Sequence, residues 1–267
     1  MSRIAASFDA LKREDKKGFI PFITAGDPDL EATTGLIIEL ARVGATVIEL
    51  GVPFSDPMAD GPIIQRASER ALRQRFGLVE VLDTVRAARK QTEVPIVLFS
   101  YFNPLLQFGL ESLAREAEDA RLDGILATDL APEEAGRFSA MLRAHEIDRI
   151  FLVAPTSTDA RLQMVAQRAT GFIYAVSRAG VTGTREEMST EAEKLVRRVR
   201  QFSDLPVAVG FGISTPEHVR DVWRYADAAV VGSAIVEEIE RYAGQSELPA
   251  HIAQFAQTLM TPAVPQI

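Results

Sequence analysis

Short apolar segments alternate with longer amphipathic segments along the whole chain, and this pattern predicts eight repeats of a strand followed by a helix. The apolar segments are blocks rather than strict alternations, as is typical of strands that are buried on both faces of a parallel sheet. The predicted strands are Phe19–Ile23, Val47–Leu50, Ile96–Tyr101, Gly124–Ala127, Ile150–Val153, Phe172–Val176, Val207–Val209 and Ala228–Val231.

Helix start signals precede several of the amphipathic segments. Asp29 stands directly before one of them, and Thr215 and Pro216 open another. These residue types favour the first turn of a helix. A further helix over Ser2–Arg13 precedes the first strand and is expected to close the bottom of a barrel. The other predicted helices include Leu30–Val43, Glu133–His145, Arg161–Arg168 and the segment from Pro216 through Trp223.

Eight strand–helix units of one type predict an α/β fold, namely a (β/α)8 TIM barrel with an extra N-terminal helix. Most predicted strands start 21 to 28 residues apart, but the intervals after the second and sixth strands are 49 and 35 residues. Such extra length enters the loops at the carboxyl ends of the strands, where barrel enzymes hold their catalytic groups. No linker is visible, so residues 1–267 are expected to form a single domain. An open, doubly wound sheet is the alternative.

The composition excludes several classes of site and partner. The chain has no cysteine, which excludes disulfides, thiolate zinc sites and cysteine nucleophiles. Its net charge is −8 and it has no basic run, so we expect no nucleic-acid partner. The apolar runs are far shorter than the roughly 20 residues of a membrane span, and the N-terminus has no apolar signal core. These features predict a cytoplasmic protein with no membrane partner.

Acidic residues gather at the end of the second predicted strand. Glu49 lies inside an apolar strand, and the loop that follows carries Asp56 and Asp60 among three prolines and two glycines. Partial burial raises the pKa of a glutamate toward neutrality while a solvated aspartate stays ionised, and such a pair suits general acid–base catalysis. The alternatives are a solvated glutamate and aspartates that serve only the turns. The spacing alone does not choose between Asp56 and Asp60.

Three glycine-containing segments follow the last three predicted strands. They are Gly180–Gly183, Gly210–Ser214 and Gly232–Ser233. Small residues let backbone N–H groups approach an anion, and the N-termini of helices add positive potential. Because barrels often bind a phosphate near their last two strands, we expect a phosphorylated substrate, although glycine also serves turns.

The few lysines and histidines do not suit two common aldolase mechanisms. None of the five lysines lies at a strand end, where a Schiff-base aldolase would need one. The three histidines, His145, His218 and His251, are scattered and form no set of metal ligands, so we expect no metal. Carbon–carbon bond chemistry would therefore depend on carboxylates.

Five segments of the sequence resemble the tryptophan synthase alpha subunit. They fall within residues 19 to 236, and the second segment is long and highly specific. The segments are Pro21–Pro28, Glu49–Pro62, Ser177–Gly183, Gly210–Ser214 and Gly232–Val236. The resemblance implies a barrel that cleaves indole-3-glycerol phosphate to indole and glyceraldehyde 3-phosphate. Such an enzyme is a carbon–carbon lyase that runs a retro-aldol reaction.

The resemblance also implies the catalytic residues and the partner. The family's catalytic glutamate falls on Glu49, which would protonate indole C3 and take a proton from the glycerol hydroxyl. The catalytic aspartate falls on Asp60, which would stabilise positive charge at the indole nitrogen. Indole would pass to a beta subunit in an α2β2 heterotetramer for L-tryptophan synthesis. Pyridoxal phosphate would belong to that subunit, so this chain would need no cofactor. Pro53 and Asp56 would contact the partner.

Matching strand positions assign the rest of the substrate site. The indole ring is expected among six side chains: Phe22, Phe99, Leu126, Leu152, Tyr174 and Phe211. The phosphate is assigned to Gly183, Gly212, Gly232 and Ser233. Thr182 is expected to meet Asp60 when residues 178–190 close over the site and exclude water. The sequence departs from the family pattern at Thr128 and Ala131, and neither departure removes a catalytic group.

Three other functions stay open at this stage. A stand-alone lyase would release free indole, and high activity of the isolated chain would favour it. A non-catalytic chain would only activate a beta subunit, but the presence of Glu49, Asp60 and the glycine loops argues against that role. Another phosphate-binding barrel would be an isomerase.

Overall fold

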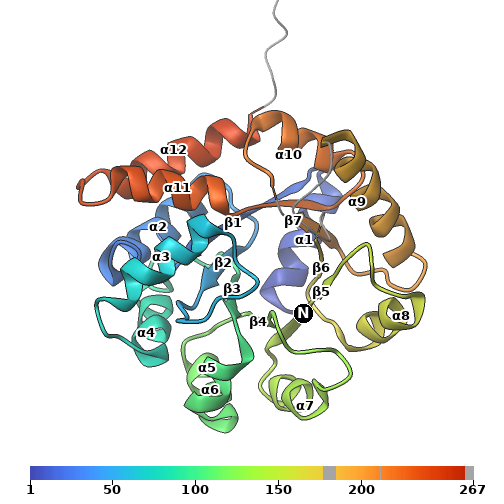
Figure 1. The fold of residues 1–267 in the computed structure, drawn as a ribbon, viewed down its shortest axis with the longest axis horizontal. Coiled ribbons are helices and arrows are strands. Elements are labelled where there is room, and N and C mark those ends of the chain that lie inside the picture. The colour runs from blue at the N-terminus through green and yellow to red at the C-terminus, as the bar shows by residue number, and fades with distance from the viewer. Residues whose placement is uncertain (177–184, 211, 262–267) are drawn as a thin grey trace, which may run out of the picture.

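Eight parallel strands close into a barrel in the computed structural model of the chain, which describes residues 1–176, 185–210 and 212–261 (Figure 1). Each strand pairs with the next along the chain, and the last pairs with the first. This closed order confirms the predicted (β/α)8 barrel and rules out the open sheet. The strands are β1 Gly18–Thr24, β2 Ile48–Gly51, β3 Ile96–Ser100, β4 Gly124–Ala127, β5 Asp148–Val153, β6 Ile173–Val176, β7 Val207–Gly210 and β8 Ala228–Val231.

Helices form a ring outside the strands (Figure 1). Within the described residues two helices, rather than one, follow each of β2, β3 and β8. The long interval after β2 therefore holds a loop, 52–61, and two helices. The helices are α1 Arg3–Arg13, α2 Leu30–Arg42, α3 Pro62–Leu72, α4 Leu78–Ala88, α5 Phe102–Phe108, α6 Leu110–Asp119, α7 Gly136–Ala144, α8 Asp159–Arg168, α9 Arg185–Val199, α10 Pro216–Trp223, α11 Ser233–Tyr242 and α12 Leu248–Met260.

Helix α7 begins at Gly136, three residues later than the sequence predicts. The residues before it form a separate turn, because the N–H groups of Glu134 and Ala135 bond back to the carbonyl of Ala131. Arg168 of α8 also donates to the carbonyl of Pro132. A proline is therefore not the first residue of this helix.

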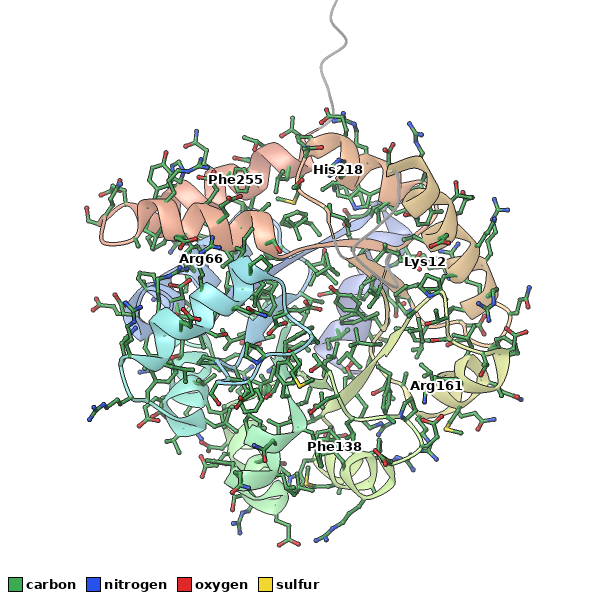
Figure 2. The ribbon with its side chains drawn as sticks, in the orientation of Figure 1. Lys12, Arg66, Phe138, Arg161, His218 and Phe255 are labelled. Carbon is green, nitrogen blue, oxygen red and sulfur yellow. The ribbon has the colours of Figure 1, made fainter. Side chains whose placement is uncertain are left out.

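Side chains from alternate strand positions fill the inside of the barrel (Figure 2). Helix α1 contributes to this inner core, because Ile4 is fully buried in it and Phe8 packs against Phe172 with ring centroids 5.9 Å apart. A Cβ on Gly124, the first residue of β4, would lie 3.3 Å from Ile4, which places α1 at the amino ends of the strands. The extra helix thus closes the bottom of the barrel, as predicted.

The outward faces of the strands pack on the helix layer. Ile23, Leu50 and Leu98 belong to the same buried cluster as Leu36 and Ile37 of α2. Because helices cover the outside and α1 covers the bottom, the carboxyl ends of the strands are left as the face where a site can form.

Among the described residues, no helix combines the length and the apolar character that a bilayer crossing requires.

Candidate active site

Glu49 is the buried carboxyl group of the barrel interior. Its Cα pairs with Phe22 of β1 and Val97 of β3, and it lies on the inward face of β2. The side chain is 1% exposed, and Oε1 has no hydrogen-bond partner among the described residues. Burial raises the pKa of Glu49 well above its ordinary value. The site therefore favours the protonated acid.

Tyr174 of β6 lies close enough to Glu49 for the two groups to interact electrostatically. Burial, with a further contribution from the charge of Glu49, raises the pKa of Tyr174 well above its ordinary value. A Cβ at Gly210, the last residue of β7, would lie 2.1 Å from the Tyr174 hydroxyl oxygen. Glycine at this position therefore makes the space for the hydroxyl group.

Phe22 and Phe99 form an aromatic surface beside Glu49. Their ring centroids are 5.3 Å apart with an edge-to-face angle of 80°, and Phe99 lies 6.5 Å from Tyr174 by the same measure. A Cβ at Gly51 would lie 2.5 Å from Cζ of Phe22. The glycine after Glu49-Leu50 thus admits the Phe22 ring into the barrel mouth.

Two leucines extend this apolar surface. Leu126 is fully buried in the inner core, and Leu152 packs against it while staying partly exposed. The structure thus brings together five of the six side chains that were assigned to the indole ring. The sixth, Phe211, lies outside the described residues, as do Thr182, Gly183 and residues 178–184 of the segment 178–190 that is expected to close over the site.

The two departures from the family pattern lie at the neighbouring rim. Thr128 and Ala131 line a cavity with Leu152 and Val176, between the ends of β4 and β5. The Thr128 hydroxyl is buried and has no hydrogen-bond partner among the described residues. Thr128 and Ala131 therefore form part of the wall of the barrel mouth and lie outside the cavity of Asp60.

Asp60 stands at the end of the loop 52–61. It lines a small cavity with Phe22, Phe99 and Tyr101, so the loop brings this acidic residue to the aromatic surface. Burial raises the pKa of Asp60 to about 6, and a hydrogen bond with Tyr101 opposes the rise. The sequence predicts a solvated aspartate, and that prediction is wrong because the loop partly buries the group.

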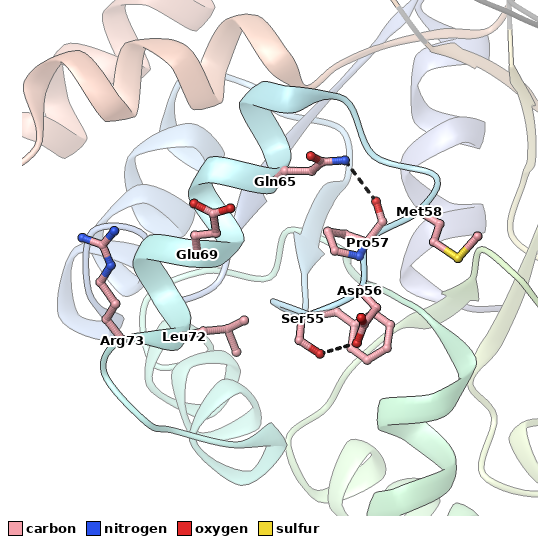
Figure 3. A pocket seen from close by; sticks show the side chains of 9 residues that line it. Ser55, Asp56, Pro57, Met58, Gln65, Glu69, Leu72 and Arg73 are labelled. Atoms are coloured by element: carbon pink, nitrogen blue, oxygen red, sulfur yellow. Dashed lines mark hydrogen bonds between the residues drawn. The ribbon is translucent and has the colours of Figure 1, made fainter.

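The other side of the loop forms a groove against α3 (Figure 3). Asp56 is exposed there and accepts a hydrogen bond of 2.6 Å from the Ser55 hydroxyl, and Met58 is 93% exposed. The Gln65 amide points toward the Pro57 carbonyl at 3.5 Å. Asp56 therefore lies in the groove rather than in the cavity of Asp60, whereas Pro53 is buried within the chain.

Ion pairs attach α3 to two neighbouring elements. The Arg70 guanidinium makes two bonds of 2.8 Å to the buried carboxylate of Asp27, in the loop after β1. It makes a third bond of 2.7 Å to Glu240 of α11. The Gln74 amide, just after α3, donates to the Gly26 carbonyl at 2.6 Å. The helix that follows Asp60 is thereby fixed to the barrel.

Part of the expected phosphate region is described. Gly212 has φ +73° and open space where a side chain would begin. Gly232 is the N-cap of α11, and Ser233 is its exposed first residue. The first N–H groups of a helix have no partner within the helix, and its dipole favours anions. The ends of β7 and β8 can therefore receive a phosphate group.

Sequence reasoning missed Tyr101, which follows the last residue of β3. Its hydroxyl accepts a hydrogen bond of 2.8 Å from the Ala59 N–H, and it lines the small cavity beside Asp60. Its place two residues after Phe99, on the same face of the predicted strand Ile96–Tyr101, is the signal that the sequence offers. No group of three acidic, histidine or cysteine side chains within 1–176, 185–210 and 212–261 could hold a metal ion.

Comparisons with known proteins give consistent results. The family profile described as tryptophan synthase alpha chain matches residues 8–263. The chain is similar to the tryptophan synthase alpha chains of Solibacter usitatus, at 49% identity over 97% of both chains, and of Geobacter sulfurreducens, at 50% identity over 97% and 98%.

Solved structures are similar along nearly the whole chain. Tryptophan synthase subunit alpha from Legionella pneumophila has a TM-score of 0.89 and 39% identity, covering 97% of both chains. A chain of the tryptophan synthase a2b2 complex from Pyrococcus furiosus has a TM-score of 0.84 and 40% identity, covering 91% of this chain and 97% of its own.

Proposed function

This chain belongs to the tryptophan synthase alpha chain family, and from that membership we propose that Glu49 and Asp60 carry its chemistry. The chain is a lyase that catalyses the alpha reaction, the cleavage of indole-3-glycerol phosphate to indole and glyceraldehyde 3-phosphate. Its partner is a tryptophan synthase beta subunit.

The observation that carries the proposal is the buried carboxyl group of Glu49, whose Oε1 has no hydrogen-bond partner within the described part of the chain. A retro-aldol cleavage needs an electron sink, and protonation of indole C3 turns the ring into one. Because burial raises the pKa of Glu49, the group enters the reaction as an acid and delivers this proton. The carboxylate that results then takes the proton from the glycerol hydroxyl as the carbon–carbon bond breaks.

Asp60 has the complementary role. With its pKa at about 6, it is mainly ionised at neutral pH. The carboxylate faces the cavity lined by Phe22 and Phe99, where it accepts the indole N–H and stabilises the positive charge that develops on the ring. Glu49 thus acts in its neutral form while Asp60 acts in its charged form, because the two environments differ.

The remaining contacts position the substrate. Phe22, Phe99, Leu126, Leu152 and Tyr174 form the apolar wall for the indole ring. The phosphate would bind at Gly212, Gly232 and Ser233, where backbone N–H groups at the start of α11 face the rim. Thr182, Gly183 and Phe211 complete the assignment from the family pattern.

We infer that the chain uses no cofactor of its own, because protonated indole provides the electron sink. Pyridoxal phosphate would serve the beta subunit, which condenses indole with serine. An α2β2 assembly, the form named for the Pyrococcus furiosus protein, is the expected complex. The beta subunit would contact the outer face of the loop 52–61 at the exposed residues Asp56 and Met58, and the buried Pro53 would keep that part of the loop rigid. We place the complex in the cytoplasm and the whole chain in one domain.

Release of indole from indole-3-glycerol phosphate tests the proposal. Purified chain is assayed alone and with a beta subunit, and indole and glyceraldehyde 3-phosphate are both measured. We expect weak activity alone and clear activation by the partner. High activity without the partner would indicate a stand-alone lyase. Beta-subunit activation without any cleavage would indicate a non-catalytic chain.

A further inference from the structure

Tyr101 joins the Asp60 loop to the rigid wall of the barrel. It lies between β3 and α5 and is 6% exposed. Its hydroxyl accepts the hydrogen bond of 2.8 Å from the Ala59 N–H, and it lines one small cavity with Asp60, where hydrogen bonding to the hydroxyl lowers the pKa of the Asp60 carboxyl group. One hydroxyl group therefore contacts the catalytic residue and the residue before it.

The backbone around Tyr101 is held independently of the loop. The Tyr101 carbonyl accepts a hydrogen bond of 2.9 Å from the Ser100 hydroxyl, and the next N–H, of Phe102, donates to Asp129 at 2.6 Å. On the loop side, the Phe54 ring packs on the Tyr101 ring with centroids 5.1 Å apart. The Tyr101 ring is thus held by the barrel, and the loop 52–61 packs on it through Phe54.

Other contacts hold the backbone of Asp60 but not its carboxylate. The Asp60 N–H donates to the Pro57 carbonyl at 3.0 Å, and the Asp60 carbonyl accepts from the Gln65 amide at 2.9 Å. In the part of the chain that the structure describes, Tyr101 is the side chain whose hydrogen bond acts on the charge of Asp60. This hydroxyl, bonded to the Ala59 N–H in the cavity that Asp60 also lines, is therefore the group placed to orient the carboxylate.

We propose that Tyr101 is a positioning residue for the cleavage reaction: its hydroxyl orients the Asp60 carboxylate toward the indole N–H, and its ring couples that orientation to Phe54 on the loop that bears the partner face. This inference rests on the proposed function of Asp60. Tyr101 does not need to touch the substrate to act in this way.

The groups around Tyr101 and Asp60 determine in which direction loss of the Tyr101 hydroxyl shifts the pKa of Asp60. A hydrogen bond to a carboxylate favours the ionised form, so loss of the Tyr101 hydroxyl raises the pKa of Asp60 further above about 6. Burial and the charges of Asp60 and Asp129 raise the pKa of Tyr101 to about 12, so it stays a donor at neutral pH. Besides burial, the Tyr101 hydrogen bond shifts the pKa of Asp60, and no charged group among the described residues is found to do so.

The experiment compares Tyr101→Phe with wild type in the alpha reaction, with and without the beta subunit, from pH 5 to pH 9. The acid limb of kcat/KM reports the ionisation of Asp60 in the free enzyme. In Tyr101→Phe we expect this acid limb to lie about one pH unit higher than in wild type. At pH values below the limb, kcat/KM should be about tenfold lower than in wild type, and above pH 8 the two values should agree within about twofold. Tyr242→Phe, on α11 and stacked on His251, is the matched control and should leave the profile unchanged.

A merely structural role would lower activity equally at every pH, and that result overturns the proposal. A second readout needs no catalysis: ¹³C-labelled aspartate, with the Asp60 signal assigned by its loss in Asp60→Asn, gives the pKa of Asp60 directly. An unchanged pKa in folded Tyr101→Phe contradicts the inference even if activity falls. If wild type itself cleaves no substrate, the proposed function fails, whereas a pKa shift in that same protein would still support the hydrogen bond.

Discussion

Replacement of Glu49 by glutamine should make the protein less active and, at alkaline pH, more stable. The amide has nearly the same shape as the acid but carries no titrating proton. General acid–base catalysis contributes about 10²- to 10⁴-fold, so turnover should fall at least about 10²-fold, or roughly 2.7 kcal/mol in activation free energy. Substrate should still bind, because the aromatic wall and the phosphate region are untouched.

The stability change follows from the raised pKa of Glu49. Its folded-state pKa lies above the ordinary 4.5, so the folded state binds the proton more tightly than the unfolded state. The associated stability is complete below pH 4.5 and is lost as the pH rises through the folded-state pKa. In that window one proton changes the free energy of unfolding by about 1.4 kcal/mol per pH unit. Glu49→Gln removes this dependence.

The assay combines indole release with thermal unfolding at pH 5, 7 and 9. We expect the melting temperature of Glu49→Gln to exceed that of wild type by an amount that grows with pH. Glu134→Gln removes the same charge from an exposed position and is the matched control. Near-normal turnover in the variant, or a difference in melting temperature that does not depend on pH, would refute the reasoning.

Four further substitutions test other parts of the site. Asp60→Asn should abolish most indole release while glycerol phosphates still bind. Asp56→Asn should leave cleavage by the isolated chain intact. The opposite pattern in the same assay would show that Asp56, and not Asp60, is the catalytic aspartate. Gly210→Ala should lower both the melting temperature and kcat, because its Cβ would lie 2.1 Å from the Tyr174 hydroxyl oxygen. Wild-type values for both would show that Tyr174 can move aside to accept the methyl group. Gly212→Val should weaken binding of glycerol phosphate in calorimetry, because φ is +73° and a side chain would block the approach of phosphate to the backbone. Binding of an analogue without phosphate should not change. Equal losses of affinity for both ligands would contradict the phosphate assignment.

The barrel could be predicted from the sequence because its signals are local. Each apolar block becomes part of a strand of four to seven residues, and start signals such as Asp29 cap the helices that follow, as the bond from the Ala32 N–H to its carboxylate shows. Helix α7 was placed too early because a hydrogen-bonded turn after Ala131 competes with helix initiation at Pro132. Arg168, which lies 36 residues away along the chain, also donates to this turn.

The environment of the site was less predictable than its residues. Glu49 could be identified because a single acid interrupts an apolar strand. The burial of Asp60 and its bond to Tyr101 depend on how the loop 52–61 folds over the next strand, and neither residue type nor spacing encodes that contact. The role of Gly210 was likewise hidden, since the sequence suggested a phosphate loop while the structure shows that it also makes room for Tyr174.

The attachment of α3 by Arg70 has a consequence for the entropy of assembly. The loop 52–61 runs between Gly51, inside the sheet, and Pro62, at the start of a helix that Asp27 and Glu240 hold in place. A ten-residue segment with two fixed ends and internal prolines explores few backbone conformations before any partner arrives. A beta subunit that binds its outer face therefore has few dihedral angles left to order, and the usual entropic penalty of about 1 kcal/mol or more per fixed residue is largely avoided.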